Sequence, residues 1–253
     1  MQSEKLLPIA MRIGSLMLEY GAEIYRVEES IYRICKAYGA VSTDVFAIPS
    51  SIIVTMYMEN EDAITLSKRV FAKQTDFDKV DQLNNLSRYV CSNLPDANTI
   101  NELIQVIMAR PEYNQKSVLI AYAIIPAAFC LFFKGTLVDA AFSMITGIVV
   151  KYLLDILYRF KSNTIFTNII CSSIGSLLAI LFVKLGLAEN YDKIIIGTIM
   201  LLVPGLILTT SMRDFMMGDL MAGMLRLIEA LLVATGIAIG VALILTLFGF
   251  NIL

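Results

Sequence analysis

Long apolar runs fill the second half of the sequence, and this feature most constrains the fold. Only 8 of the 20 Lys and Arg residues and 7 of the 22 Asp and Glu residues lie after position 116. About 20 apolar residues in helical form cross the roughly 30 Å hydrocarbon core of a bilayer. Lipid offers no hydrogen-bond partners to the backbone, whereas a helix pairs its own N–H and C=O groups. We therefore expect residues 117–253 to form a transmembrane helical bundle.

The apolar runs divide into about five predicted spans, separated by charged residues or tight turns. A proline-glycine pair interrupts the fourth, and an odd number of spans leaves the chain without a simple internal two-fold repeat. Because many transporters are built from paired repeats, a second subunit or a homo-oligomer would supply the missing half. The five ranges are Ser117–Phe133, Leu137–Tyr158, Thr164–Val183, Ile194–Met212 and Ala222–Phe250.

Residues 1–116 have the charge of a soluble domain, with 12 basic and 15 acidic residues (12 − 15 = −3). Apolar spacing first predicts two helices, then three β-rich runs that favour a small antiparallel sheet, then two more helices. The sequence therefore predicts an N-terminal α/β domain. Its expected elements are Leu6–Tyr20, Ala22–Tyr38, Val41–Ala47, Ser51–Met58, Ile64–Phe71, Phe77–Asn93 and Thr99–Ala109.

The distribution of basic residues favours an N-terminal domain in the cytoplasm. Positive charges accumulate in the cytoplasmic loops of membrane proteins. No secretory signal pattern opens the sequence, so we expect the N-terminal domain to stay in the cytoplasm. In that orientation Lys134, Lys184 and Lys193 lie outside, whereas the inner side holds Arg110, Lys116, Arg159, Lys161 and Arg213.

Several classes of chemistry find no support. Histidine is absent and the four cysteines form no closely spaced pair, so no metal site and no Ser-His or Cys-His nucleophile is predicted. There is no glycine-rich phosphate loop, and a net charge of −2 offers no surface for nucleic acid. We expect no cofactor and no enzymatic activity.

Polar residues inside the predicted spans are candidates for a transport path, because a charge in hydrocarbon is costly and needs a partner or water. Lys151 and Asp155 lie one helical turn apart, so they either neutralise each other or face the path. Asn168 begins a polar stripe with Ser172 and Ser176, which fits either a packing seam or the path. Gly236 and Gly240 form a GxxxG pattern that favours packing.

The segment after Pro204-Gly205 is the most suggestive. Proline removes a backbone donor and breaks a helix, and broken spans are common substrate sites. A guanidinium binds a carboxylate bidentately, so Arg213 or Arg226 would suit a carboxylate ligand. The alternative is a charged cytoplasmic loop in which Arg226 pairs with Glu229. The candidate path residues are Pro204, Gly205, Thr209, Arg213, Asp214, Gly218, Asp219, Arg226 and Glu229, with Asp155, Lys151 and Asn168.

Two motifs give this sequence a family resemblance. The run Leu202-Val203-Pro204-Gly205, followed by Arg213-Asp214-Phe215, Gly218-Asp219, Gly223, Arg226 and Glu229-Ala230-Leu231-Leu232, resembles the threonine/serine exporter family. So does the N-terminal run from Leu18 to Glu28, with its motif residues Glu19, Gly21, Glu23, Arg26 and Glu28. The resemblance joins both motifs in the expected order and covers nearly the whole chain.

The resemblance implies a larger subunit of a split, two-component exporter. It implies a smaller partner with about four spans, and export of a small carboxylate-bearing metabolite such as threonine, serine or a dicarboxylate like succinate. A proton gradient could drive such export. With no histidine present, carboxylates such as Asp155, Asp219 or Glu229 would carry the proton.

Two other functions stay open at this stage. One is a regulatory or scaffold subunit that gates a partner. The other is a membrane-anchored hydrolase, with Glu19, Glu23 or Glu28 as acid or base and Ser50 or Ser51 as nucleophile.

Overall fold

The computed structural model describes residues 3–59, 62–71, 75–111, 113–160 and 162–249, so that Lys161 and Phe250 of the sequence predictions lie outside the described residues. The chain forms two compact units. Unit 1 comprises residues 1–111 and 208–227, and unit 2 comprises residues 112–207 and 228–253.

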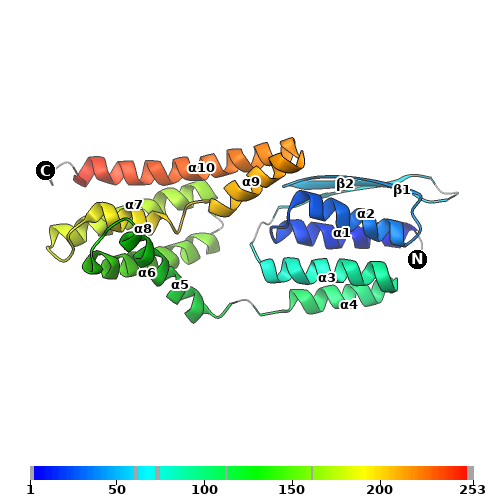
Figure 1. The fold of residues 1–253 in the computed structure, drawn as a ribbon, viewed down its shortest axis with the longest axis horizontal. Coiled ribbons are helices and arrows are strands. Elements are labelled where there is room, and N and C mark those ends of the chain that lie inside the picture. The colour runs from blue at the N-terminus through cyan, green and yellow to red at the C-terminus, as the bar shows by residue number, and fades with distance from the viewer. Residues whose placement is uncertain (1–2, 60–61, 72–74, 112, 161, 250–253) are drawn as a thin grey trace. The chain divides into compact units, whose positions relative to one another are not determined.

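Unit 1 is layered from helices and a small sheet, which is loosely consistent with the predicted N-terminal α/β domain. Helices α1 (Ser3–Glu19) and α2 (Ile24–Ala37) lie between a three-stranded sheet and a second helix pair (Figure 1). The antiparallel sheet has the order β1-β2-β3, and Phe46 pairs with Ile53, which pairs with Ser67. The remaining bounds are β1 (Ser42–Ile48), β2 (Ser51–Tyr57), β3 (Ile64–Arg69), α3 (Phe77–Asn93) and α4 (Ala97–Met108).

The core of unit 1 forms where α1 and α2 meet the inner face of the sheet. Alternate residues of β2 point inward, so Ile52, Val54 and Met56 are fully buried while Ile53 and Tyr57 face outward. This alternation is what a half-buried strand requires. Ala222, far along the chain, belongs to the same core cluster, because residues 208–227 join this unit although the sequence had placed them in the membrane part.

Unit 2 holds three of the four helices that are long and apolar enough to cross a membrane among the described residues: α5 (Gln115–Phe132), α6 (Leu137–Arg159) and α7 (Thr164–Lys184). The fourth is α10 (Leu220–Ile244), which a π-helical turn extends to residue 249 and which enters unit 2 at residue 228. These four helices correspond to predicted spans one, two, three and five. Their first and last residues lie within three positions of the predicted ones, apart from the predicted end at Phe250, which is outside the described residues.

The prediction of five spans is not confirmed, because Ile194–Met212 is not a single helix. It forms the short helices α8 (Tyr191–Ile199) and α9 (Gly205–Met217), separated by a turn over residues 200–204. Pro204 has no N–H to continue the helical ladder. Nine residues at 1.5 Å each make α8 about 14 Å long, roughly half of a hydrocarbon core.

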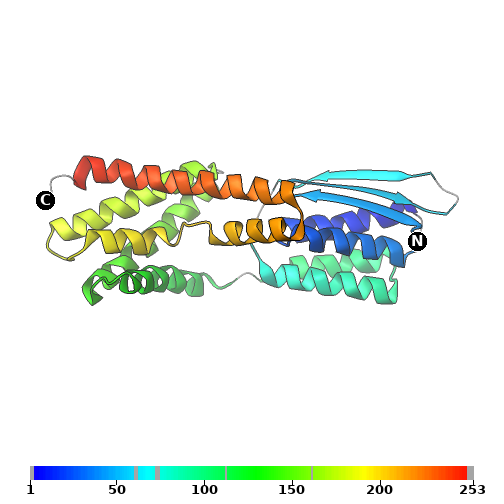
Figure 2. The same cartoon turned by 45° about the horizontal axis from the view of Figure 1, so that its top comes forward.

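Small residues let the helices of unit 2 approach closely. A Cβ atom added to Gly197 of α8 would lie 2.5 Å from the Pro126 carbonyl oxygen of α5. The Thr146 and Thr198 hydroxyls, on α6 and α8, are hydrogen-bonded at 2.6 Å. Helix α8 therefore packs against α5, α6 and α7 (Figure 2). Gly-based close packing of this kind is typical of helices in membranes.

Candidate functional site

The C-terminal motif forms a helical hairpin of α9 and the first turns of α10, within unit 1. Gly218 ends α9 with φ +91°, and the Asp219 N–H donates to the Asp214 carbonyl oxygen at 2.9 Å. This is the Schellman helix ending, whose left-handed residue favours glycine. The Ser211 hydroxyl closes the hairpin by donating to the Gly223 carbonyl oxygen at 2.8 Å.

The N-terminal motif forms a turn of the same kind between α1 and α2. Gly21 has φ +96°, and the Ala22 N–H donates to the Met17 carbonyl oxygen at 2.9 Å. We call residues 20–23 the Gly21 turn. The glycine of each motif is therefore explained by the helix ending that it makes.

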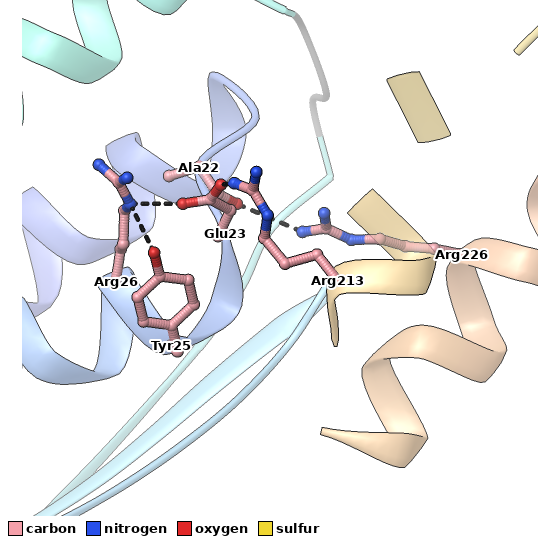
Figure 3. Close-up of polar contacts among 6 residues, drawn as sticks. All are labelled: Ala22, Glu23, Tyr25, Arg26, Arg213 and Arg226. Carbon is pink, nitrogen blue, oxygen red and sulfur yellow. Dashed lines mark hydrogen bonds and ion pairs between the residues drawn. The ribbon is translucent and has the colours of Figure 1, made fainter. Parts of the chain in front are cut away.

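Glu23 lies at the point where the two motifs meet. Its carboxylate is paired with Arg26 of α2 and with Arg213 of α9 (Figure 3). Arg26 also donates to the Tyr25 hydroxyl at 3.1 Å. The Glu23 side chain is mostly buried, whereas 55% of the Arg213 side chain is exposed. More than half of the Arg213 side chain thus remains accessible to solvent.

Asp214 and Arg226 form a second, buried pair beside the first. The Arg226 Nε lies 3.3 Å from the Asp214 Oδ2, and another guanidinium nitrogen donates to the Ala22 carbonyl oxygen at 3.3 Å (Figure 3). Exposed fractions are 10% for the Arg226 side chain and 1% for Asp214. Arg226 therefore joins the hairpin to the Gly21 turn.

Glu28 and Asp219 extend this group of charges. The Glu28 carboxylate accepts a hydrogen bond from the Ala47 N–H of β1 at 2.7 Å. Burial raises the pKa of Glu28, and the negative charge of Asp219 raises it further. Burial also raises the pKa of Asp214, against the opposing effect of Arg226. The structure thus brings together five of the motif residues of the C-terminal hairpin with four of the N-terminal motif.

Other predicted residues lie elsewhere. Glu19 lies close to Lys68 of β3. Burial lowers the pKa of Lys68, and the negative charge of Glu19 opposes part of this shift. Pro204 and Gly205 mark the break between α8 and α9 and fall in unit 2, as does Glu229. Thr209 lies on α9, in unit 1.

Lys151 and Asp155 form an ion pair along one face of α6. The Lys151 ammonium lies 5.7 Å from the centre of the Tyr122 ring. Asp155 also lines an open pocket of about 660 Å³, together with Gln115, Tyr158 and Arg159. Both sequence interpretations of this pair are therefore compatible: its charges neutralise each other, and its carboxylate faces an accessible space.

Asn168 lies in a packed seam of unit 2. Its amide donates to the Thr164 carbonyl oxygen within α7 at 2.9 Å. The Ser173 hydroxyl of the same helix donates to the Gly240 carbonyl oxygen of α10 at 3.1 Å, and a Cβ atom at Gly236 would lie 3.1 Å from the Ile165 carbonyl oxygen. The polar stripe and the GxxxG pattern thus pack against each other, which favours the structural interpretation of both.

Sequence analysis missed Asp139, which is fully buried near the start of α6. One carboxylate oxygen accepts from the Glu189 and Asn190 N–H groups at 2.9 and 3.0 Å. The other accepts from the Thr136 N–H and the Asn190 side-chain amide at 3.0 and 2.9 Å. A capping-box pattern, Thr136-x-x-Asp139, was the local signal available, but nothing local pointed to the loop before α8.

The side chains considered for hydrolysis have other contacts. Glu23 is held by two arginines, Glu28 accepts from β1, and the Ser51 hydroxyl donates to the Lys68 carbonyl oxygen at 3.5 Å.

The chain is similar to known exporters along nearly its whole length. A family model of threonine/serine exporters matches residues 8–248. The "Probable threonine/serine exporter" of Mycobacterium tuberculosis is 22% identical over 95% of this chain and 46% of its own length. The "Threonine/serine exporter" of Corynebacterium glutamicum is 23% identical over 93% of this chain and 50% of its own length. The chain thus spans about half the length of these two relatives.

A third relative has about the length of this chain. The "Probable succinate transporter subunit YjjP" of Klebsiella aerogenes is 22% identical, over 95% of this chain and 93% of its own length. No solved structure matches. Because the family match includes both motifs and all four candidate spans, the chain belongs to the threonine/serine exporter family.

Proposed function

We propose that this chain is one subunit of a secondary exporter that moves small carboxylate-bearing metabolites out of the bacterial cytoplasm. The observation that carries the proposal is the family match over residues 8–248, which runs through both units of a chain with four candidate spans. The N-terminal domain lies in the cytoplasm, and the protein lies in the inner membrane. Relatives named as exporters of threonine and serine, or as a succinate transporter subunit, support this substrate class.

The chain would work with a smaller membrane subunit of about four spans. It covers about half of the two long relatives but nearly all of a relative that is named a subunit. The half-length helix α8 and the turn before Pro204 resemble the broken helices at which transporters bind substrates. A homo-oligomer is the alternative way to complete the path.

Arg213 is the group of unit 1 best suited to meet a substrate carboxylate. More than half of its side chain is exposed, and its partner Glu23 also pairs with Arg26. A substrate carboxylate would replace Glu23 on Arg213, and Arg26 would keep Glu23 neutralised. Guanidinium-carboxylate pairs of this kind are strong and directional.

The open pocket of unit 2 is a second contact point for a small metabolite. Its volume of about 660 Å³ lies in the usual range of ligand sites, roughly 300–1,000 Å³. Asp155 and Arg159 are one helical turn apart on α6 and both line the pocket. This pair offers a carboxylate for an ammonium group and a guanidinium for a carboxylate.

Efflux from proteoliposomes tests the proposal. Vesicles with this chain, with the chain and its smaller partner, and with neither would be loaded with threonine, serine or succinate. We expect efflux of at least one of them only when both subunits are present. The absence of efflux of all three in every preparation would contradict the proposal.

Single substitutions then separate a transporting from a scaffold role. We expect Arg213→Gln to slow efflux on the order of tenfold, as the loss of one charge-assisted contact implies. Lys184→Gln, which removes an exposed charge from the end of α7, is the matched control. Unchanged efflux in Arg213→Gln, with both subunits still assembled, would favour a scaffold role for this chain.

A further inference from the structure

The environment of Asp214 is unusual for an ionised carboxylate. The residue is 1% exposed, and neither carboxylate oxygen accepts a hydrogen bond from any residue that the structure describes. Its nearest cation is Arg226, at 3.3 Å from one oxygen. A buried charge needs both a counter-ion and hydrogen bonds to offset its lost hydration. Asp214 has the first and lacks the second among the described residues.

The charged residues of the hairpin, the Gly21 turn and the start of α2 that interact with one another sum to an excess of negative charge. Arg226 faces it from α10, Arg213 from its own helix, and Asp219 from the turn between them. The Gly21 turn and α2 add Glu23, Arg26 and Glu28. The sum is 3 − 4 = −1, from the three arginines Arg26, Arg213 and Arg226 and the four carboxylates Glu23, Glu28, Asp214 and Asp219.

We propose that Asp214 is a proton-binding group, and that the α9–α10 hairpin takes up a proton when it packs against the Gly21 turn. A proton on Asp214 neutralises the buried carboxylate and so removes the cost of burying its charge. It also brings the summed charge of these seven residues from −1 to zero. Arg226 stays beside the neutral carboxyl group and keeps its hydrogen bond to the Ala22 carbonyl oxygen, so the hairpin stays docked. The raised pKa of Asp214 agrees with this geometry.

The sign of the effect follows from linkage. A group whose pKa is higher in the docked state than in water stabilises docking at low pH. As the pH rises, the exposed carboxyl loses its proton first, and docking weakens until the buried carboxyl is also ionised. At a pH between the exposed and the docked pKa values, undocking therefore releases a proton. This binding does not depend on the proposed export, although it would supply an exporter with a coupling group.

Hydrogen-deuterium exchange of the full chain in lipid nanodiscs tests the proposal. After correction for intrinsic rates, we expect amides of residues 208–227 to exchange faster at about pH 8 than at about pH 4, near the usual pKa of an exposed Asp carboxyl group. The protection of the hairpin should fall as the pH rises from that value towards the raised pKa of the docked carboxyl group. The same exchange at both pH values would overturn the proposal.

Three substitutions identify the titrating group. Asp214→Asn is neutral at every pH, so its hairpin should be better protected than the wild type at about pH 8 and keep only the pH dependence that Glu28 contributes. Asp219→Asn removes a like charge and should move the midpoint to lower pH. Asp44→Asn, an exposed change on β1, is the matched control and should behave like the wild type.

Asp214→Asn and Asp219→Asn each test the proposal, so the outcome does not depend on one variant alone. If Asp214→Asn does not fold, the midpoint of Asp219→Asn still decides. A wild-type midpoint in either variant would assign the titration to another group and overturn the proposal. Since no step measures transport, a failure here leaves the proposed export untouched, and a loss of export with intact pH dependence leaves this site in place.

Discussion

Replacing Asp139 with asparagine tests how the start of α8 is held in unit 2. The aspartate accepts four hydrogen bonds, two at each oxygen, and is fully buried. An asparagine oxygen in the place of Oδ1 keeps the bonds from the Glu189 and Asn190 N–H groups. Its NH₂ group then faces two further donors, the Thr136 N–H and the Asn190 amide, which both lose their acceptor.

The magnitude follows from those two orphaned donors. Each buried, unsatisfied donor costs roughly 1–3 kcal/mol, so the free energy of unfolding should fall by roughly 2–6 kcal/mol. For a chain of this size that corresponds to a decrease in Tm of roughly 5 to 20 °C. Thermal unfolding of purified wild type and Asp139→Asn in the same detergent measures this difference.

The control lies at the same end of the bundle. Asp192 is an exposed residue in the first turn of α8 and pairs with Lys193 at 2.7 Å. Exposed pairs contribute little, so Asp192→Asn should unfold near the wild-type temperature. If both variants unfold at the same temperature, the four hydrogen bonds at Asp139 do not hold the loop, and the reasoning is refuted.

Three further substitutions test other contacts. Gly240→Ala should lower the free energy of unfolding by about 1–3 kcal/mol, because the added Cβ would collide with the Ser172 hydroxyl in the α7–α10 seam. Thermal unfolding measures this difference, and a wild-type Tm would contradict close packing of α7 on α10. Arg213→Glu should raise hydrogen exchange in the hairpin, whereas Arg213→Lys, which keeps a positive charge beside Glu23, should stay closer to the wild type; equal exchange in the two variants would argue against the pair. Glu28→Gln should remove a loss of stability that begins as the pH rises above the usual pKa of a Glu carboxyl group, since a raised pKa stabilises the folded state only at low pH. Thermal unfolding at about pH 4 and at about pH 8 measures it, and an unchanged pH dependence would contradict this assignment.

Local patterns were sufficient for most of the elements. Strand alternation predicted β2, and the apolar runs predicted α5, α6 and α7, because burial periodicity and span length depend only on consecutive residues. Pro204-Gly205 indicated a break, but its consequence was underestimated: the predicted span became a half-length helix and a helix of unit 1.

By itself, the sequence determined which helices are long and apolar enough to cross a membrane, the order of most elements and the residues of the two motifs. All of these depend on composition and on neighbours within a few positions. The tertiary structure alone decided that Arg226 would contact Ala22, about two hundred positions earlier, and that Asp214 would be buried beside it. It also decided that Asp139 would hold the loop before α8. Such pairings arise when packing brings distant segments together, and the identity of a charged residue does not state which distant partner or how much water it will have.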